Sequence, residues 1–145
     1  PEAESSNEVH VKYYANPNWE GPPVFEDNNK MLAFYWEPDA RPVRTPFSLQ
    51  IEGEILIPES GETLFHLKSE ERSFLEINGQ TVVNNSDPAN PQGAIGGVQT
   101  RKGWHPFRIR YSDRAGGGLV KLEWQMQNGF IQEIPRDCVR LRKPS

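Results

Sequence analysis

The 145-residue chain lacks the features that mark several common classes of protein. Its single cysteine, Cys138, leaves no partner for a disulfide within the chain. No stretch approaches the roughly 18 apolar residues that a membrane-spanning helix needs, so we expect no direct membrane insertion. Only 35% of the residues are hydrophobic, and 12 glycines and 13 prolines divide the chain into short segments. These features exclude a helical bundle and argue against a doubly wound α/β fold.

The chain also lacks an excess of positive charge. Its 16 basic and 20 acidic residues give a formal net charge of −4, which disfavours a general nucleic-acid binder. The basic residues of 136–143 are interpreted as a solvated strand end. We interpret Cys138, which lies beside Val139 and Leu141, as a small core residue rather than a reactive thiol.

Alternation of apolar and polar residues is what the chain has instead. From Phe47 to Ile57 the apolar residues fall on one face of an extended strand, opposite Ser48, Gln50 and two glutamates. Gly53 in the middle of this strand indicates a bulge or a close backbone approach. Similar but shorter patterns predict strands at 9–14, 31–36, 63–69, 74–77, 80–84, 98–100, 104–112, 120–126, 130–134 and 139–141.

Tight turns connect several of these strands. Asn78-Gly79 and Asn128-Gly129 are strong two-residue hairpin signals, and residues 85–97 are expected to form a long polar loop. About ten short strands with alternating faces indicate a β-sandwich or a barrel, and we predict an all-β fold, an antiparallel sandwich. Residues 1–8 are predicted to be a polar linker and residues 9–145 a single module, monomeric when excised from a longer polypeptide.

No motif of a known catalytic centre is present. The chain has no nucleophile elbow, no phosphate-binding loop and no metal-ligand spacing among His10, His66 and His105. Glu70-Glu71 and Asp113 are candidates for a glycosidase carboxylate pair, and the alternative is that they are solvated at strand ends. Because nothing else indicates a substrate cleft, we expect the chain not to be an enzyme.

Four segments carry a resemblance to one family. They are VKYYANPNWEGPPV, FSLQIEGEILIPESGETLFHLKSEERSFLEINGQTVVNN, KGWHPFRIRYSDRAGGGLVKLEW and IPRDCVRL. In order and spacing they resemble the PA-fourteen domain family, named for anthrax protective antigen and shared with yeast flocculins and bacterial β-glucosidases. The resemblance covers residues 9–141, and it implies a β-sandwich and carbohydrate binding.

In the calcium-dependent members of that family, two consecutive aspartates bind a calcium ion that takes the sugar hydroxyls. The aspartate pair aligns with Glu70-Glu71, the candidate metal ligands, and Arg72-Ser73 replace the glycine expected after it. The longer side chains and the guanidinium beside them disfavour calcium as a cofactor. The ligand-binding residues implied by the resemblance are Glu70, Glu71, Arg72, Asn84, Asn85, Asp87 and Asp113.

The tryptophans are interpreted mainly as packing residues. Trp36 and Trp124 lie among apolar strand residues, and Trp19 and Trp104 match packing positions of the family.

Two functions stay open. One is a non-catalytic carbohydrate-binding or adhesion module of a larger extracellular, cell-surface or periplasmic protein, with a glycan as its partner. The other is a structural or protein-interaction module with a degenerate cation site, attached to a glycan-processing or membrane-bound glycosyltransferase-type polypeptide.

Overall fold

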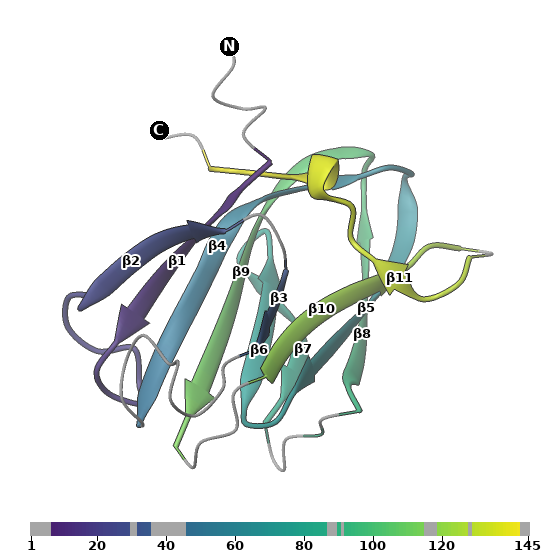
Figure 1. Ribbon diagram of the computed structural model, residues 1–145. Helices are drawn as coiled ribbons and strands as arrows, with labels where there is room; N and C mark the ends of the chain where they lie inside the picture. The colour runs from purple at the N-terminus through teal and green to yellow at the C-terminus, as the bar shows by residue number, and fades with distance from the viewer. Residues whose placement is uncertain are drawn as a thin grey trace.

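The computed structural model describes residues 7–29, 32–35, 46–86, 90, 92–114, 119–127 and 129–142. Two antiparallel sheets pack face to face (Figure 1), which confirms the predicted all-β sandwich. Sheet A contains, in spatial order, β2 (Phe25–Asn29), β1 (Val9–Tyr14), β4 (Phe47–Ile57), β9 (Gly103–Asp113), β6 (Ser73–Ile77) and β7 (Gln80–Asn85), with β12 (Val139–Arg140) also beside β4. Sheet B contains β11 (Gln132–Glu133), β10 (Leu119–Gln125), β5 (Gly61–Ser69) and β8 (Ala94–Thr100), with β3 (Ala33–Tyr35) also beside β10.

The core lies between the two sheets, where the apolar faces of the alternating strands meet. Strands β4 and β9 form its central pair, in register from Phe47 opposite Asp113 to Ile57 opposite Gly103. The largest fully buried side chains include Tyr111, Phe47 and Phe65. Burial of each such side chain away from water contributes about 1.5–3 kcal/mol to the stability of the fold. Within the described residues no helix is long and apolar enough to span a membrane.

Where the apolar alternation is strong, the strand boundaries agree with the sequence. Strand β4 has the predicted bounds, and the hairpin between β6 and β7 turns at Asn78 and Gly79, whose φ angles are 53° and 80°. A two-residue turn of the mirror-image type needs two such positive φ angles, and Asn-Gly provides them at low cost. Of the other predicted hairpin signal, Asn128 lies outside the described residues.

Three strands differ from the sequence-based expectation. Strand β2 was not predicted, because its residues FEDNN have no apolar alternation, and it forms by pairing with β1. Strand β8 begins at Ala94 inside the expected loop, since pairing with β5 extends it past two glycines. The expected strand at 130–134 is reduced to the two residues of β11.

Two glycines mark the closest backbone approaches in the sandwich. A methyl group at Gly53 would lie 2.8 Å from the carbonyl oxygen of Arg140, so this glycine allows β12 to pair with β4. At Gly96 a methyl group would lie 1.9 Å from the carbonyl oxygen of Val82. Gly96 therefore lets β8 of sheet B approach β7 of sheet A, which closes one side of the sandwich.

Candidate functional site

The loops at one end of the sandwich bring together segments that are far apart in the sequence. This loop end, defined by residues 69–73, 86 and 112–114, is at the bottom of Figure 1, where the arrow of β9 ends. The backbone N–H of Ser112 donates to the carbonyl oxygen of Arg72 at 3.0 Å, which joins β9 to the turn between β5 and β6. The 3-10 turn η3 (Arg136–Cys138) is at the opposite end, at the top of the figure.

Buried hydroxyls hold the turn between β5 and β6 in place. The hydroxyl of Ser69 donates to the carbonyl oxygen of Glu71 at 2.6 Å. It also lies 2.6 Å from the hydroxyl of Ser73, and both serines are fully buried. Because buried polar groups need partners, these contacts fix the backbone that presents Glu71 and Arg72.

The carboxylate of Glu71 is tied to the end of β9. Its Oε1 atom accepts a hydrogen bond of 2.6 Å from the backbone N–H of Arg114. Glu71 is half-buried, whereas the preceding Glu70 is exposed and its backbone N–H donates to Leu119 at 3.2 Å. The two glutamates therefore make different contacts: the side chain of Glu71 binds the end of β9, and the backbone of Glu70 binds Leu119.

The guanidinium of Arg72 contacts the loop that follows β1. Its Nη2 atom donates to the carbonyl oxygen of Pro17 at 3.2 Å and to Oδ1 of Asn18 at 3.3 Å. The guanidinium also stacks on the indole of Trp19, 5.4 Å from the ring centroid, and that of Arg110 lies 5.7 Å from the same ring. Cation–π contacts of this kind hold a charged group in one orientation.

Trp19 is fixed by both of its N–H groups. The backbone N–H donates to Oγ of Ser48 at 3.0 Å, and the indole Nε1 donates to the carbonyl oxygen of Leu49 at 2.8 Å. The residue has a φ of 55°, an uncommon value for a side chain of this size. Trp19 therefore anchors its loop to β4, as the packing interpretation expected.

A pocket of about 390 Å³ opens at the loop end. Its wall consists of five polar residues from three segments: Glu71, Arg72, Ser86, Ser112 and Arg114. Pockets of this volume accommodate small ligands or single units of larger ones. We refer to it as the loop-end pocket.

Of the described residues implied by the resemblance, Glu71 and Arg72 line the loop-end pocket. Asp113 is fully buried and accepts a hydrogen bond of 3.1 Å from the hydroxyl of Tyr111. Glu70 and Asn84 are exposed near the pocket, and Asp87 lies outside the described residues.

Asn85 has a structural role. Its side chain is 2% exposed and donates to the carbonyl oxygens of Leu67 and Asn90 at 3.0 and 2.9 Å. Its Oδ1 atom accepts the N–H of Asn90 at 2.7 Å. Both ends of the amide are thus bonded within the protein, and Asn85 ties Asn90 to the backbone of β5.

Sequence reasoning missed Ser86, Ser112 and Arg114. Ser86 ends a match to the N-glycosylation sequon, Asn84-Asn85-Ser86, which does not indicate a binding pocket. Ser112 belongs to no motif, and the only local signal for Arg114 is its place directly after Asp113 at the end of a predicted strand. These residues reach the pocket through the pairing of β9 with β6 and through the hairpin of β6 and β7.

The donor set at this end does not fit a calcium ion. Calcium takes six to eight oxygen ligands, most of them from carboxylates and carbonyls. Glu71 already accepts a backbone N–H, Asp113 accepts a tyrosine hydroxyl, and the positive charge of Arg72 lines the same pocket as Glu71. Within the described residues no group of three or more acidic, histidine or cysteine side chains comes together.

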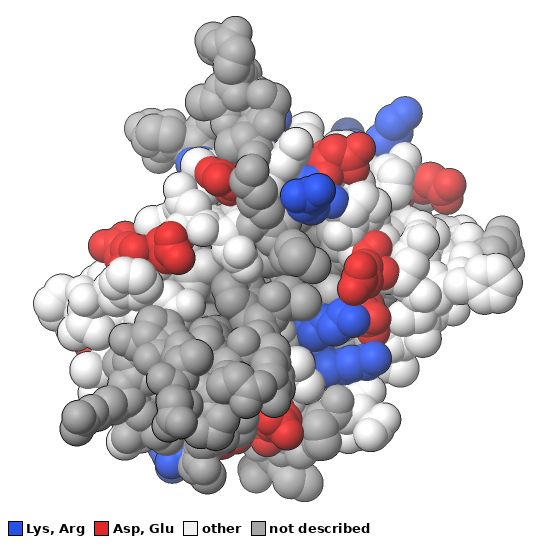
Figure 2. Space-filling view, viewed as in Figure 1, with Lys and Arg blue, Asp and Glu red and all other residues white. Residues whose placement is uncertain are grey.

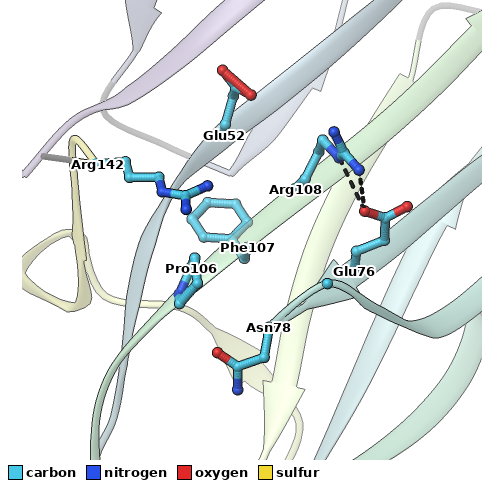
Figure 3. A pocket seen from close by; sticks show the side chains of 8 residues that line it. Glu52, Glu76, Asn78, Pro106, Phe107, Arg108 and Arg142 are labelled. Atoms are coloured by element: carbon cyan, nitrogen blue, oxygen red, sulfur yellow. Dashed lines mark hydrogen bonds and ion pairs between the residues drawn. The ribbon is translucent and has the colours of Figure 1, made fainter. Parts of the chain in front are cut away.

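A second pocket, of about 440 Å³, lies on the outer face of sheet A (Figure 3). Arg108 donates to Oε1 of Glu76 through Nε at 3.0 Å and through Nη2 at 2.6 Å. Glu52 on the other side of the pocket pairs with Lys12 at 3.1 Å and accepts from Gln50 at 2.8 Å. The acidic groups of this pocket are therefore neutralised by the protein.

Charges on the outer face of sheet B are also paired within the protein. Figure 2 shows basic and acidic side chains side by side over β10 and β11. Glu123 lies 3.0 Å from Lys68 and 3.4 Å from Lys121. Burial raises the pKa of Glu123, but the two lysines outweigh this effect and the pKa lies below its ordinary value. Among the described residues, this face presents no unpaired acidic cluster to a ligand.

Comparisons with known proteins give a family and a fold. The model of the PA14 domain family matches residues 8–137. An anti-sigma factor domain-containing protein from Clostridium clariflavum is similar in structure, with a TM-score of 0.79 and 19% identity over 94% of this chain and 48% of its own. This chain thus spans about half the length of that relative. No curated protein matches the chain significantly.

Two further solved structures align with this chain over nearly the whole length of both proteins. The epithelial adhesin 9 A domain from Candida glabrata, solved in complex with Galβ1-4GlcNAc, has a TM-score of 0.72 and 12% identity over 98% of this chain and 92% of its own. A PA14 sugar-binding domain from an RTX adhesin has a TM-score of 0.65 and 15% identity over 92% and 98%. At these identities the similarity establishes the sandwich fold alone.

Proposed function

Because the chain belongs to the PA14 domain family, we propose that it is a non-catalytic carbohydrate-binding or adhesion module. We place it, as a single unit of residues 9–145, in a larger extracellular, cell-surface or periplasmic protein. Two similar structures support this proposal, one an adhesin domain solved with a disaccharide and one described as sugar-binding.

The observation that carries the proposal is the loop-end pocket. Its five residues offer both kinds of hydrogen-bonding group: the guanidiniums of Arg72 and Arg114 donate and the carboxylate of Glu71 accepts. The hydroxyls of Ser86 and Ser112, whose hydrogens are bonded to Asn84 and Pro17, also accept. Sugar hydroxyls also donate and accept, so a hollow lined by mixed groups matches them better than it matches an apolar ligand.

We further propose that binding at this pocket is independent of calcium. In the calcium-dependent members that the resemblance describes, the ion supplies the positive charge at the sugar. Here the stacked guanidinium of Arg72 supplies a fixed positive charge at the wall of the pocket. A permanent side-chain charge needs no ion to be recruited.

The state of the carboxylates supports a non-catalytic role. A glycosidase needs two carboxyl groups that both reach the scissile bond. Asp113 is fully buried and bonded to Tyr111, and Glu71 Oε1 is bonded to the backbone of Arg114. This pair therefore does not have the arrangement of an acid and a nucleophile on opposite sides of a substrate.

A second function, a structural or protein-interaction module of a glycan-processing polypeptide, is favoured by one observation. Phe130 is 90% exposed and the adjacent Ile131 is 50% exposed, both on the segment between β10 and β11. Exposed large apolar side chains that are adjacent in the sequence are typical of contacts with another protein surface.

An array of neutral and acidic glycans, probed in calcium and again in excess EDTA, tests the proposed function. We expect at least one class of glycan to be bound in both conditions, and calorimetry to give the same dissociation constant in each. Binding to no glycan in either condition would contradict the carbohydrate-binding function and favour the protein-interaction alternative. Binding that requires calcium would contradict only its calcium independence.

A further inference from the structure

We propose that the loop-end pocket recognises the carboxylate of an acidic sugar residue, with Arg72 and Arg114 as the carboxylate-binding side chains. This inference rests on the proposed carbohydrate-binding function and names the class of glycan. Acidic sugar here means a hexuronic or sialic acid unit within a glycan, which combines one carboxylate with several hydroxyls.

Positive charge without an acidic partner gathers at the loop end. Within the described residues neither Arg72 nor Arg114 has an ion pair with a carboxylate, and the partners of the Arg72 guanidinium are a carbonyl, an amide oxygen and an indole ring. Elsewhere on sheet A the situation differs, since Arg108 pairs with Glu76 and Arg140 pairs with Glu54, each at 2.6 Å. Arg110 and Arg142 also lack such a pair among the described residues, but Arg72 and Arg114 line one pocket together, and there two guanidiniums can stabilise an external anion.

Arg72 is also held in position before any ligand arrives. Stacking on Trp19 and the two hydrogen bonds of Nη2 restrict its long side chain to one orientation. A guanidinium that is oriented in advance loses little freedom on binding a carboxylate.

The remaining wall of the pocket suits hydroxyls and opposes a bare anion. The hydroxyl of Ser112 donates to Pro17 at 2.8 Å, so its oxygen remains an acceptor for a sugar hydroxyl. Glu71, on the same wall, accepts hydroxyl hydrogens but repels a group of high negative charge such as phosphate. One carboxylate beside several hydroxyls is the ligand that satisfies both the arginines and Glu71.

The overall charge of the chain makes this pocket an exception. With a net charge of −4, the protein as a whole repels acidic polymers. Binding of an acidic glycan therefore depends on local guanidiniums, and removal of one of them is expected to have a large effect.

The test compares glycans that carry hexuronic or sialic acid with the same glycans after reduction of the carboxylate to a primary alcohol, in EDTA. We expect the carboxylated form to bind about tenfold more tightly or better, as for charge-assisted bidentate pairs. Arg114→Gln, at an exposed position, is expected to remove this preference while leaving the melting temperature unchanged. Arg101→Gln, an exposed arginine at the opposite end of β9, is the matched control and is expected to bind as the wild type does.

Four results are distinguishable. Equal binding of carboxylated and reduced glycans, or an unchanged preference in Arg114→Gln, overturns this inference and leaves the proposed function standing. Competition by acetate or by an acidic peptide as effective as that of the glycan also overturns it, because the site would then recognise any carboxylate. Tighter binding of sulfated than of carboxylated glycans overturns the assignment of the carboxylate. Binding of no glycan overturns the proposed function itself.

Discussion

The guanidinium of Arg72 lies 5.4 Å from the centroid of the Trp19 ring, although the two residues belong to different loops. Trp19 is itself bonded through Nε1 to the carbonyl oxygen of Leu49 on β4. The central strand of sheet A thus positions the tryptophan, and the tryptophan positions the arginine of the loop-end pocket. A positive charge is thereby built into the fold at the wall of the loop-end pocket.

Trp19→Phe tests this chain of contacts. The phenylalanine keeps a ring under Arg72 but loses the Nε1 hydrogen bond, so we expect unfolding free energy to fall by about 1 kcal/mol in urea denaturation. Glycan binding is expected to weaken, because the ring and the guanidinium lose their fixed positions. The control is Trp104→Phe, whose ring stacks with Arg140 on another part of sheet A and is expected to leave binding unchanged. A Trp19→Phe variant with full stability and full binding would show that the loop is anchored by other contacts.

Gly96→Ala tests the contact between the two sheets. A methyl group there would lie 1.9 Å from the backbone oxygen of Val82, which cannot move without shifting β7. We expect a loss of about 2–3 kcal/mol or more in unfolding free energy, as for overpacked cores.

The neighbouring Gly97 is the matched control for this substitution. A methyl group at Gly97 first meets the carboxylate of Glu62 at 2.8 Å, the far end of a flexible side chain. Gly97→Ala is therefore expected to change stability by less than about 1 kcal/mol. Equal effects of the two substitutions would contradict the close approach of β7 and β8.

The sequence predicted those parts of the fold that depend on local pattern. Strand β4 and the Asn78-Gly79 turn follow from alternation and from turn chemistry within a few residues. Strand β2 could not be predicted in this way, because its polar residues become a strand only through their pairing with β1. The same reason explains why β8 extends further than its glycine-rich sequence indicates.

The loop-end pocket could be predicted only in part. Family resemblance indicated Glu71 and Arg72, which lie next to each other in the sequence. Arg114 contacts Glu71 through a backbone hydrogen bond that depends on the register of β9 against β6. The burial of Asp113 and the internal bonds of Asn85 depend equally on packing, so the sequence could not separate these structural residues from the residues that line the pocket.

His10 is predicted to make stability depend on pH. Burial lowers the pKa of His10, but hydrogen bonds to Asn28 at 2.8 Å and to Glu26 at 2.6 Å outweigh burial and raise it above 6.5. Because the pKa is raised in the folded protein, the stabilisation from protonated His10 is fully present below the pKa of the unfolded chain. It is lost as the pH rises through the pKa of the folded protein. Because the pair is partly exposed, the loss between pH 6 and pH 8.5 is expected to stay below about 1 kcal/mol.

Melting temperatures of the wild type and of His10→Gln across this range measure the effect. The difference between the two proteins is expected to shrink as the pH rises. A difference that grows with pH would contradict the direction of the pKa shift.

Cys138 is predicted to be an unreactive thiol. Burial, with Asp137 beside it, raises its pKa to about 11. At pH 8 only about one thiol in a thousand is then a thiolate, the form that reacts. We expect labelling of the folded protein by Ellman's reagent to be at least tenfold slower than labelling of the protein in urea. Equal rates would show that the thiol is accessible and that its pKa is not raised.

The most direct test of the loop-end pocket as the binding site is a backbone NMR titration in EDTA with the glycan that binds most tightly on the array. The amide signals of Ser86, Ser112 and Arg114 are predicted to shift with a common dissociation constant, while those of Glu52, Glu76 and Arg108 around the pocket of Figure 3 stay in place. Shifts confined to the pocket of Figure 3, or shifts that appear only after calcium is added, would contradict the account.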